Sequence, residues 1–301
     1  MKRKVLFVAS LFLATATFAQ DGLTSKKGEA YLPEAGDWAL GFDAAPFIGY
    51  FGDFANGTSN NSMTAAWQDG ARWSIVGKYF KDETTAYRGR VRIGFGSTSN
   101  DFIGFYDADA DPSTNAVEYT NTAKTSNFNI VLGGGIEKRR GNTRIQGYYG
   151  GELLISLGSS SQSWDYGRAY TADWSNPANS LENEEAPIGN IQGTGDERVT
   201  ERKAGSTFAF GLRGFVGVEW FIAPKVSLGA EYGWGLGFAS TGEGEETVEY
   251  WGFSENSTAT EPSLQSETIK TGGGSAFQLD TDNNGNSIFG GSGQINLIFH
   301  F

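Results

Sequence analysis

The stretch TAYRGRVRIGFG, from Thr85 to Gly96, alternates between apolar residues and arginines. A period of two predicts a β-strand, because successive side chains of a strand point to opposite faces. Three arginines cannot share an apolar core, and the opposite face is too apolar for water. The pattern therefore predicts a strand of a transmembrane β-barrel, with lipid outside and a polar interior. The apolar set is Tyr87, Gly89, Val91, Ile93 and Phe95, and the charged set is Arg88, Arg90 and Arg92.

The same alternation recurs along the chain and predicts an all-β fold. We expect an eight-stranded antiparallel transmembrane β-barrel with long extracellular loops and short periplasmic turns. Short connections such as 81–84 and 139–142 alternate with long ones at about 97–124, 158–204 and 239–287, which fits this asymmetry. The predicted strands cover about 37–51, 71–80, 85–96, 127–137, 144–155, 208–220, 226–238 and 289–301.

Two alternatives to the eight-stranded barrel would also give alternating strands, a water-soluble β-sandwich and a barrel of ten strands. A water-soluble β-sandwich alternates too, but its exposed face should be the polar one. Between 226 and 238 the apolar set occupies every second position, and glycine, serine and glutamate occupy the other face, which favours lipid outside. The number of strands rises to ten if part of a long loop returns to the membrane.

The N-terminal segment predicts export. Met1 to Ala19 has a basic start, a short apolar run and small residues before the expected cleavage point, as a secretory signal peptide does. The run is shorter than the roughly 20 residues of a membrane-spanning helix. We expect three parts: a signal peptide at 1–19, a periplasmic lead-in at 20–36 and an outer-membrane β-barrel at 37–301.

Composition excludes several classes of partner and anchor. The chain has a formal net charge of −12, and loss of the basic signal peptide makes the mature protein more acidic. Such a chain repels nucleic acid. It contains no cysteine, so it has neither disulfides nor a lipidated cysteine anchor. Its 43 glycines and many aromatic residues favour closely packed strands with aromatic belts at the membrane interfaces.

The last residues carry a resemblance to a known class of protein. The sequence QINLIFHF, from Gln294 to Phe301, resembles the C-terminal signal that the barrel-assembly machinery recognises in outer-membrane proteins, with its apolar positions at Ile295, Leu297, Phe299 and Phe301. The predicted barrel resembles the small barrels of the OmpA transmembrane domain and OmpX type, and the cleavage region is similar to that of Bacteroidetes secretory proteins. The resemblance implies the outer membrane of a Gram-negative bacterium, with membrane lipid and lipopolysaccharide as surroundings. It does not extend to the peptidoglycan-binding domain of OmpA or to the short loops of OmpX.

The predicted interior holds a network of charged residues. A barrel of eight strands is just wide enough for side chains to fill it, so opposite charges should pair, with Glu231 across from the arginines. Two interpretations remain open, a plug of ion pairs and a narrow, gated pore lined by arginine. The inward-facing charged residues are Asp43, Lys78, Arg88, Arg90, Arg92, Glu137, Arg144, Glu152, Arg213, Glu219 and Glu231.

The predicted outer loops hold most of the acidic residues, and two short motifs there offer oxygen ligands. Asp107, Asp109 and Asp111 form D-x-D-x-D, and Asp280, Asp282 and Asn284 begin an EF-hand-like calcium loop. The position of the bidentate glutamate is Gly291, so the calcium motif is incomplete, and Asn-Gly also forms simple turns. Loop aromatic residues could form a surface for a protein or glycan, or could pack long hairpins against each other.

The sequence predicts a protein that is not an enzyme and needs no cofactor, apart from a possible loop Ca²⁺. His300 is the only histidine and lies at the end of the chain, far from the outer rim. We expect a structural or surface-interaction role through the acidic loops. The alternatives are a small pore with an arginine-lined lumen and an accessory subunit of a larger outer-membrane complex.

Overall fold

A computed structural model describes residues 23–44, 56–57, 75–106, 117–172, 192–193, 196–253, 258, 260–279 and 294–301. These residues form a single antiparallel sheet of twelve strands, and none of them is helical. The strands are β1 (Trp38–Asp43), β2 (Ile75–Asp82), β3 (Thr85–Tyr106), β4 (Val117–Arg140), β5 (Ile145–Tyr166), β6 (Glu197–Lys203), β7 (Thr207–Ala223), β8 (Val226–Thr241), β9 (Gly244–Gly252), β10 (Ser263–Thr271), β11 (Gly274–Leu279) and β12 (Gln294–His300).

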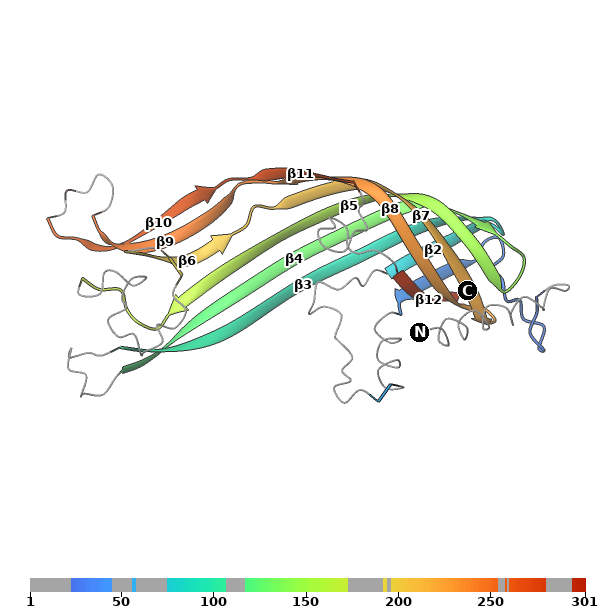
Figure 1. Ribbon diagram of the computed structural model, residues 1–301, viewed down its shortest axis with the longest axis horizontal. Helices are drawn as coiled ribbons and strands as arrows, with labels where there is room; N and C mark the ends of the chain where they lie inside the picture. Colours follow the sequence, from blue (N-terminus) through green and yellow to red (C-terminus); the bar gives the residue numbers. More distant parts are fainter. Residues whose placement is uncertain are drawn as a thin grey trace.

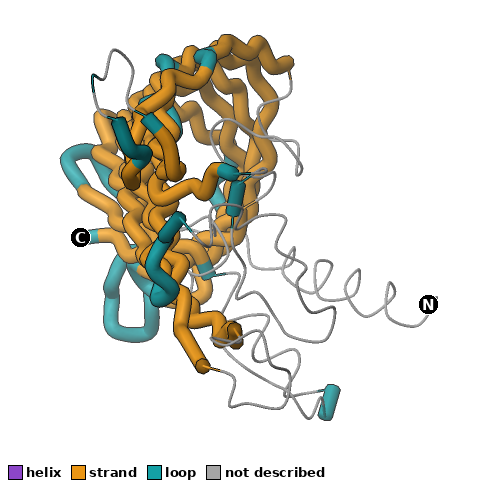
Figure 2. The backbone as a smooth tube through the Cα atoms, turned by 90° about the vertical axis from the view of Figure 1, so that its left-hand side faces the viewer, coloured by secondary structure: helices purple, strands orange, loops and turns teal. Residues whose placement is uncertain are grey.

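Eight of the strands pair in a closed circuit. Following the hydrogen-bonded neighbours gives β1, β2, β3, β4, β5, β7, β8 and β12, and β12 pairs again with β1. The chain therefore closes a barrel, and Figure 2 shows the strands curving round. The ends of the barrel wall meet where Trp38 and Phe301 exchange backbone hydrogen bonds of 2.8 and 2.9 Å.

The strands of this circuit are staggered. Directly opposed residues lead from Trp38, the first residue of β1, through Tyr87 to Trp234, which lies well above Val226, the first residue of β8. A barrel can close with such a stagger only if its strands tilt relative to the axis. The tight turns after β2, β4 and β7 lie at one end, which we call the basal end. Lys225 in the last turn has a positive φ of 59°.

Three of the described strands are much longer than a membrane span requires. β3, β4 and β5 have 22, 24 and 22 residues, whereas β1, β2 and β12 have 6, 8 and 7. A tilted membrane strand needs only about 9–11 residues. Beyond the barrel, β6, β9 and β10 add to the edge of β5, and β11 pairs with β8 beside β12. Figure 1 shows this distal extension as a long curved sheet.

The extension corrects the prediction from the sequence. We expected eight strands and loops at about 97–124, 158–204 and 239–287, but long parts of these segments are strands. The reason is that β10 and the upper part of β3 are exposed on both faces. A strand with water on both faces needs no apolar face, so the alternation that reveals a half-buried strand disappears.

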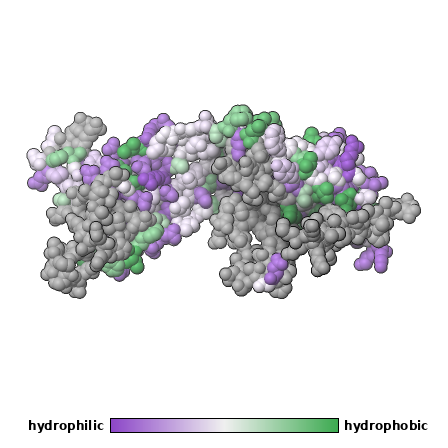
Figure 3. Space-filling model, in the orientation of Figure 1, coloured by the Kyte–Doolittle hydropathy of each residue, from purple (hydrophilic) through white to green (hydrophobic). Residues whose placement is uncertain are grey.

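The outer face of the barrel carries a continuous apolar belt. Phe95 is 74% exposed and Leu212 is 58% exposed, as are many other large apolar side chains of this face. The belt ends abruptly above Phe95 and Phe128, because the next opposed outer residues are Ser97 and Ser126. Figure 3 shows a hydrophobic patch where β8 and β11 run and more hydrophilic residues toward the distal end.

In the described part of the chain, no helix is long and apolar enough to cross a membrane. The residues before β1 form a small turn at the basal end. Thr24 and Ala30 form an isolated antiparallel bridge, Pro33 is buried, and the Arg144 guanidinium lies 4.2 Å from the centre of the Tyr31 ring. The predicted signal peptide lies outside the described residues.

Candidate functional site

The inner face of the barrel gathers charged side chains into two layers. The basal layer is organised around two buried glutamates, Glu137 and Glu219. Lys78 pairs with both carboxylates, at 3.0 Å from Glu137 and 3.2 Å from Glu219. Arg139 also bridges them, at 2.7 and 2.9 Å, and donates through Nε to Gln146 at 2.9 Å. Each carboxylate therefore faces two cations.

The upper layer repeats this arrangement with more arginines. Glu231 on β8 accepts from Arg88 at 2.7 Å, from Arg90 at 3.2 Å and from Arg213 at 2.8 Å. Glu152 on β5 contacts the same three guanidinium groups at 3.5, 3.1 and 2.8 Å, in the same order. Arg88 also reaches Glu137 at 3.5 Å and so connects the two layers. The charges form one network across the barrel.

The network is almost completely removed from water. Side-chain exposure is 8% for Arg90 and 3% or less for the other members of the two layers. Aromatic rings fill space beside the cations: Arg88 lies 4.0 Å from the centre of the Phe215 ring, and Lys78 lies 4.8 Å from that of Tyr148. A cation over a desolvated ring is stabilised by about 2 kcal/mol. Ion pairing and ring contacts both reduce the cost of burying the charges.

Glycines on neighbouring strands make room for these long side chains. A Cβ atom at Gly233 would overlap the guanidinium of Arg213, and one at Gly217 would overlap the ring of Tyr148. Both glycines face the interior, opposite large residues on the adjacent strands. The alternation of glycine with Arg, Glu and Tyr across the inner face therefore lets an eight-stranded circuit hold this many charges.

A serine, a histidine and a glutamate meet at the basal end, but they do not form a catalytic relay. His300 Nε2 lies 2.9 Å from Glu219 and 3.1 Å from Ser227 Oγ, which itself donates to Glu219 at 2.6 Å. A relay needs the two imidazole nitrogens to serve different partners, and Nδ1 has no hydrogen-bond partner among the residues that the structure describes. His300 is also fully buried, with the Phe80 and Phe221 rings 5.6 and 5.2 Å away. The group closes the base of the barrel.

The structure brings together most, but not all, of the residues predicted for the interior. Arg144 lies at the basal rim and donates to the backbone oxygens of Phe221 and Ile222 at 2.9 and 2.7 Å, outside the network. Arg92 is half-buried above the network, and the side chain of Asp43 is outside the described residues. The eight members of the network that the sequence predicted are Lys78, Arg88, Arg90, Glu137, Glu152, Arg213, Glu219 and Glu231.

The prediction from the sequence missed Arg139. It was placed in the turn 139–142, whereas it lies inside the barrel, 1% exposed, between Glu137 and Glu219. Its position could have been found, because Arg139 continues the inward parity of Glu137. The role of Gln146 as the partner of Arg139 follows only from the fold.

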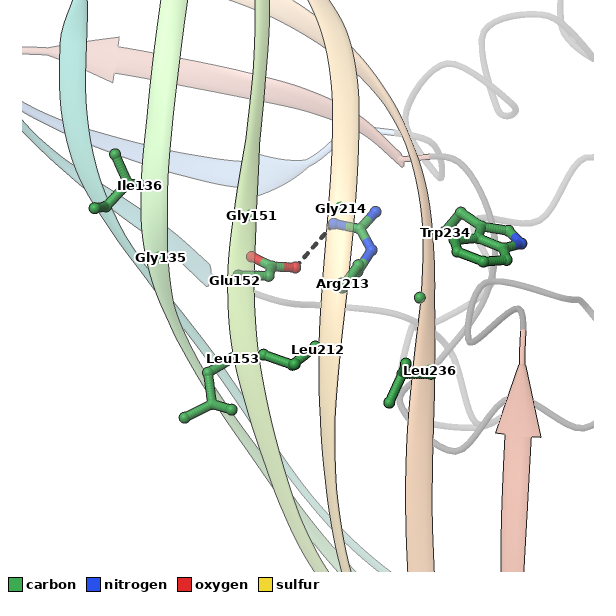
Figure 4. Close-up of a pocket in the computed structure, with 11 residues that line it drawn as sticks. Gly135, Ile136, Gly151, Glu152, Leu153, Leu212, Arg213, Gly214, Trp234 and Leu236 are labelled. Atoms are coloured by element: carbon green, nitrogen blue, oxygen red, sulfur yellow. Dashed lines mark hydrogen bonds and ion pairs between the residues drawn. The ribbon is translucent and has the colours of Figure 1, made fainter.

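The outer side of the same wall has a shallow apolar depression. Figure 4 shows Ile136, Leu212 and Trp234 around Gly151 and Gly214, with the ion pair between Glu152 and Arg213 close by. Gly151 and Gly214 oppose each other on β5 and β7, so no side chain covers the outer side of the backbone at these two positions. The network thus lies only one backbone layer away from the apolar outer surface.

A second buried cluster holds the distal extension together. Arg198 lies 4.5 and 5.1 Å from the ring centres of Tyr166 and Tyr170, pairs with Glu249 and donates to the backbone oxygen of Arg168 at 2.8 Å. Burial raises the pKa of both tyrosines to about 12. Val199 and Val248, on neighbouring strands, are 2% and 3% exposed.

The predicted cation ligands Asp107, Asp109, Asp111, Asp280, Asp282 and Asn284 lie outside the described residues. Within the described ranges, no three His, Cys, Asp or Glu side chains are grouped so that they could hold a metal ion. The positions Ile295, Leu297, Phe299 and Phe301 lie on the outward face of the last strand and just after it. Leu297 is half-buried and the other three are exposed, and their role as a recognition signal stays a prediction.

No protein-family model and no curated protein matches this sequence. Among solved structures, the chain is similar to the outer membrane protein OprG from Pseudomonas aeruginosa, with 10% sequence identity and a TM-score of 0.28. The match covers 90% of this chain and 98% of OprG. At this TM-score the two structures superpose only loosely.

Proposed function

We propose that the protein is a non-catalytic outer-membrane β-barrel with a sealed interior that presents a tall acidic extension at the cell surface. One observation carries the proposal: a closed circuit of eight strands has ion pairs inside and an apolar belt outside. This is the reverse of a water-soluble barrel, and it matches the environment of a lipid bilayer around a polar interior.

The dimensions of the belt support membrane insertion. On β3 the outward apolar residues run from Tyr87 to Phe95 and give way to serine at Ser97. At a rise of roughly 3.3 Å per residue and a tilt of about 40°, this stretch with its flanking side chains approaches the roughly 25 Å apolar band of such barrels. Trp38, Tyr79 and Phe301 at the basal end and Phe95 at the other end are placed as interfacial anchors.

The charged network supports a sealed interior in preference to an open pore. Every carboxylate of the two layers contacts at least two cations, and both layers extend across the barrel. An ion that entered would have to break pairs in a region of low dielectric constant. The alternative, a pore gated by the arginines, requires this network to open.

Conductance in a planar bilayer tests the sealed interior. We expect the folded protein to give no stable openings, because the two layers block the barrel. Glu231→Ala should introduce transient openings, since it leaves three guanidinium groups with Glu152 as their one shared carboxylate. Lys270→Ala, at the exposed pair with Glu243 in the extension, is the matched control. Stable openings of the unmodified protein would favour the arginine-lined pore instead.

The extension supplies the surface for interaction. It projects beyond the belt, it exposes both faces along much of its length, and β9 carries Glu245, Glu246 and Glu249. A role as an accessory subunit of a larger complex would use the same surface. We also expect lipopolysaccharide beside the belt, Ca²⁺ at the loops and a glycan or protein as ligand of the extension. We expect the barrel-assembly machinery to insert the protein into the membrane.

A further inference from the structure

We propose that the apolar depression on the outer face of the barrel, between Ile136 and Trp234, binds one anionic phospholipid. The phosphate of this lipid contacts Lys138 and Arg140 at the basal end, and one acyl chain follows the depression toward the middle of the membrane. The inference rests on the proposed function, because that function places the basal end of the barrel at the periplasmic leaflet. It adds a lipid site of defined chemistry to a wall that elsewhere meets lipid of any kind.

The depression is a groove with a floor of backbone and walls of apolar side chains. Gly151 on β5 and Gly214 on β7 form the floor, and Ile136 on β4 and Trp234 on β8 continue the same row of opposed residues at its two ends. The volume of the groove is about 690 Å³. Its walls are the outward-facing residues of the next rows, namely Leu153, Leu212 and Leu236 on the distal side and Tyr149, Val216 and Tyr232 on the basal side.

The groove is open to the surroundings of the barrel. Ile136 and Trp234 at its ends are 49% and 51% exposed, and both floor glycines are exposed as well. A Cβ atom at Gly151 would have the backbone oxygen of Arg213 as its nearest neighbour, at 3.7 Å. The space directly above the floor is therefore free for a ligand, and Figure 4 shows the apolar side chains around it.

The groove climbs from the basal end toward the middle of the belt. Ile136 lies close to Arg140, the last residue of β4, whereas Trp234 lies well above Val226, the first residue of β8. The groove crosses three strand spacings, which gives a length of about 14 Å. One leaflet contributes half of the roughly 30 Å hydrocarbon core. The groove therefore has the length and direction of an acyl chain that starts at the basal interface.

Two exposed cations lie at the lower end of the groove. Lys138 is the next outward residue below Ile136, and Arg140 is one step farther down β4. In β5 and β7, which are described throughout, the outward positions of the belt carry no charge. Positive charge next to the groove is thus confined to the end where a phospholipid of the periplasmic leaflet places its phosphate.

Both cations have donors available for a phosphate. An ammonium group has three donors, and Lys138 uses one on the hydroxyl of Thr85 at 2.8 Å. The carboxylate of Asp82, in the adjacent turn, accepts from the backbone N–H and the hydroxyl of Thr84 at 2.9 and 2.7 Å. Arg140 is exposed and can donate two parallel hydrogen bonds to phosphate oxygens.

The shape of the groove favours an acyl chain over a protein partner. Tyr149 and Leu153 face outward on either side of Gly151, about 14 Å apart along β5, and their side chains narrow the gap. A helix with its side chains is about 10–12 Å across, so it cannot reach the floor. A second copy would bring its own convex wall, which cannot enter the groove. An acyl chain can reach the floor, and its phosphate neutralises the two cations.

Quenching of tryptophan fluorescence by brominated lipid tests the inference on the folded protein in vesicles. The vesicles are phosphatidylcholine with a small fraction of phosphatidylglycerol or phosphatidylcholine that carries bromine midway along one acyl chain. The emission of Trp234 is the difference between the unmodified protein and Trp234→Phe. We expect brominated phosphatidylglycerol to quench this emission at an at least about tenfold lower fraction than brominated phosphatidylcholine, because two cations select the anionic headgroup.

Two pairs of variants separate the headgroup contact from the groove. Lys138→Gln combined with Arg140→Gln should abolish the preference for phosphatidylglycerol. Lys124→Gln combined with Lys203→Gln removes the same charge beyond the belt and should keep the preference.

Gly151→Leu fills the groove and should also abolish the preference. Gly89→Leu is its matched control, because Gly89 faces outward in the belt, and a Cβ there has its nearest neighbour, the backbone oxygen of Gly133, at 3.9 Å. All variants must first show the same heat-induced unfolding as the unmodified protein.

The inference is overturned if the two brominated lipids quench Trp234 equally in the unmodified protein. It is also overturned if the variant without Lys138 and Arg140 keeps the preference, or if Gly151→Leu behaves as Gly89→Leu does. Failure of the proposed function would look different, because neither brominated lipid would quench the tryptophans of a protein that lies outside the bilayer.

Discussion

The base of the barrel and the distal extension share β3, β4 and β5, but they are stabilised in opposite ways. The base concentrates its charges inside, where nine side chains form a buried ion-pair network. The extension has water on both faces of several strands and one small cluster around Arg198. The same three strands are therefore stabilised by a buried charge network within the apolar belt. Beyond the belt they are stabilised mainly by backbone hydrogen bonds.

The largest effect is expected from breaking the network in the base. Glu231→Ala removes one of the two buried carboxylates that Arg88, Arg90 and Arg213 share and leaves only Glu152. Loss of one partner from a buried ion pair costs about 3–5 kcal/mol. We expect urea to unfold this variant from lipid vesicles at a clearly lower concentration. Glu231→Gln, which keeps the shape and one acceptor, should lose less. Equal stability of the alanine variant and the unmodified protein would contradict the buried network.

The next effect tests the room that glycine provides in the base. Gly233→Ala places a methyl group where the Arg213 guanidinium lies, and overpacking of this kind costs about 1–3 kcal/mol. Gly77→Ala is the matched control, because a Cβ there meets no atom within 4 Å. Urea unfolding should separate the two variants. If they behave alike, the Arg213 guanidinium does not lie against Gly233 in the folded barrel.

In the extension, loss of Arg198 should act locally. Arg198→Ala removes the group that packs between two tyrosines and pairs with Glu249. We expect faster proteolysis and hydrogen exchange in β6 and β9, with the unfolding of the base unchanged within about 0.5 kcal/mol. Arg198→Lys should restore part of the protection. Destabilisation of the base by the same amount would show that the two regions fold as one unit.

Alkaline pH should also loosen the extension before the base. The folded pKa of Tyr166 is raised to about 12 by burial, against about 10 for an unfolded tyrosine. The neutral form is thus favoured in the folded state, so this stabilisation is present below pH 10 and is lost as the pH rises toward 12. Ultraviolet absorbance of phenolate should show the late titration, and Tyr166→Phe should remove it. A Tyr166 transition near pH 10 in the folded protein would contradict the buried ring.

The smallest effect is expected at the surface of the extension. Lys270 and Glu243 pair at 3.0 Å, but their side chains are 74% and 64% exposed. Such pairs contribute at most about 1 kcal/mol. Lys270→Ala should leave both thermal unfolding and proteolysis nearly unchanged, and added salt should remove any remaining difference. A large loss would mean that this hairpin is more tightly packed than its exposure indicates.

The sequence was most informative where lipid and the barrel interior impose opposite chemistry on alternate residues. The alternation around Arg88 and Arg90 correctly predicted antiparallel strands with arginines on one face, and it placed Glu231 opposite them. Strand ends inside the belt, such as the start of β3 at Thr85, were also predicted from short turns. In this region each side chain is compatible with only one face of the sheet, either the lipid face or the interior face.

The sequence was less informative where both faces of a strand meet water. The upper half of β3 and all of β10 carry serine, threonine and asparagine without a dominant period, so they were predicted as loops. Arg139 was missed for a different reason. A pair of arginines before Gly141 indicates a turn, and this indication outweighed the inward parity that Arg139 shares with Glu137. In the barrel Arg139 lies between Glu137 and Glu219.

The most direct test of the central claim is site-directed spin labelling along β3 in lipid bilayers. The chain has no cysteine, so single cysteines can be placed at 89, 91, 93, 95, 97 and 99 without a background label. We predict that molecular oxygen relaxes labels at 91 and 93 most strongly, whereas a water-soluble nickel complex reaches 97 and 99, with the change just above Phe95. Nickel access to 91 and 93 equal to that at 97 would contradict a membrane-spanning barrel with its apolar face in lipid.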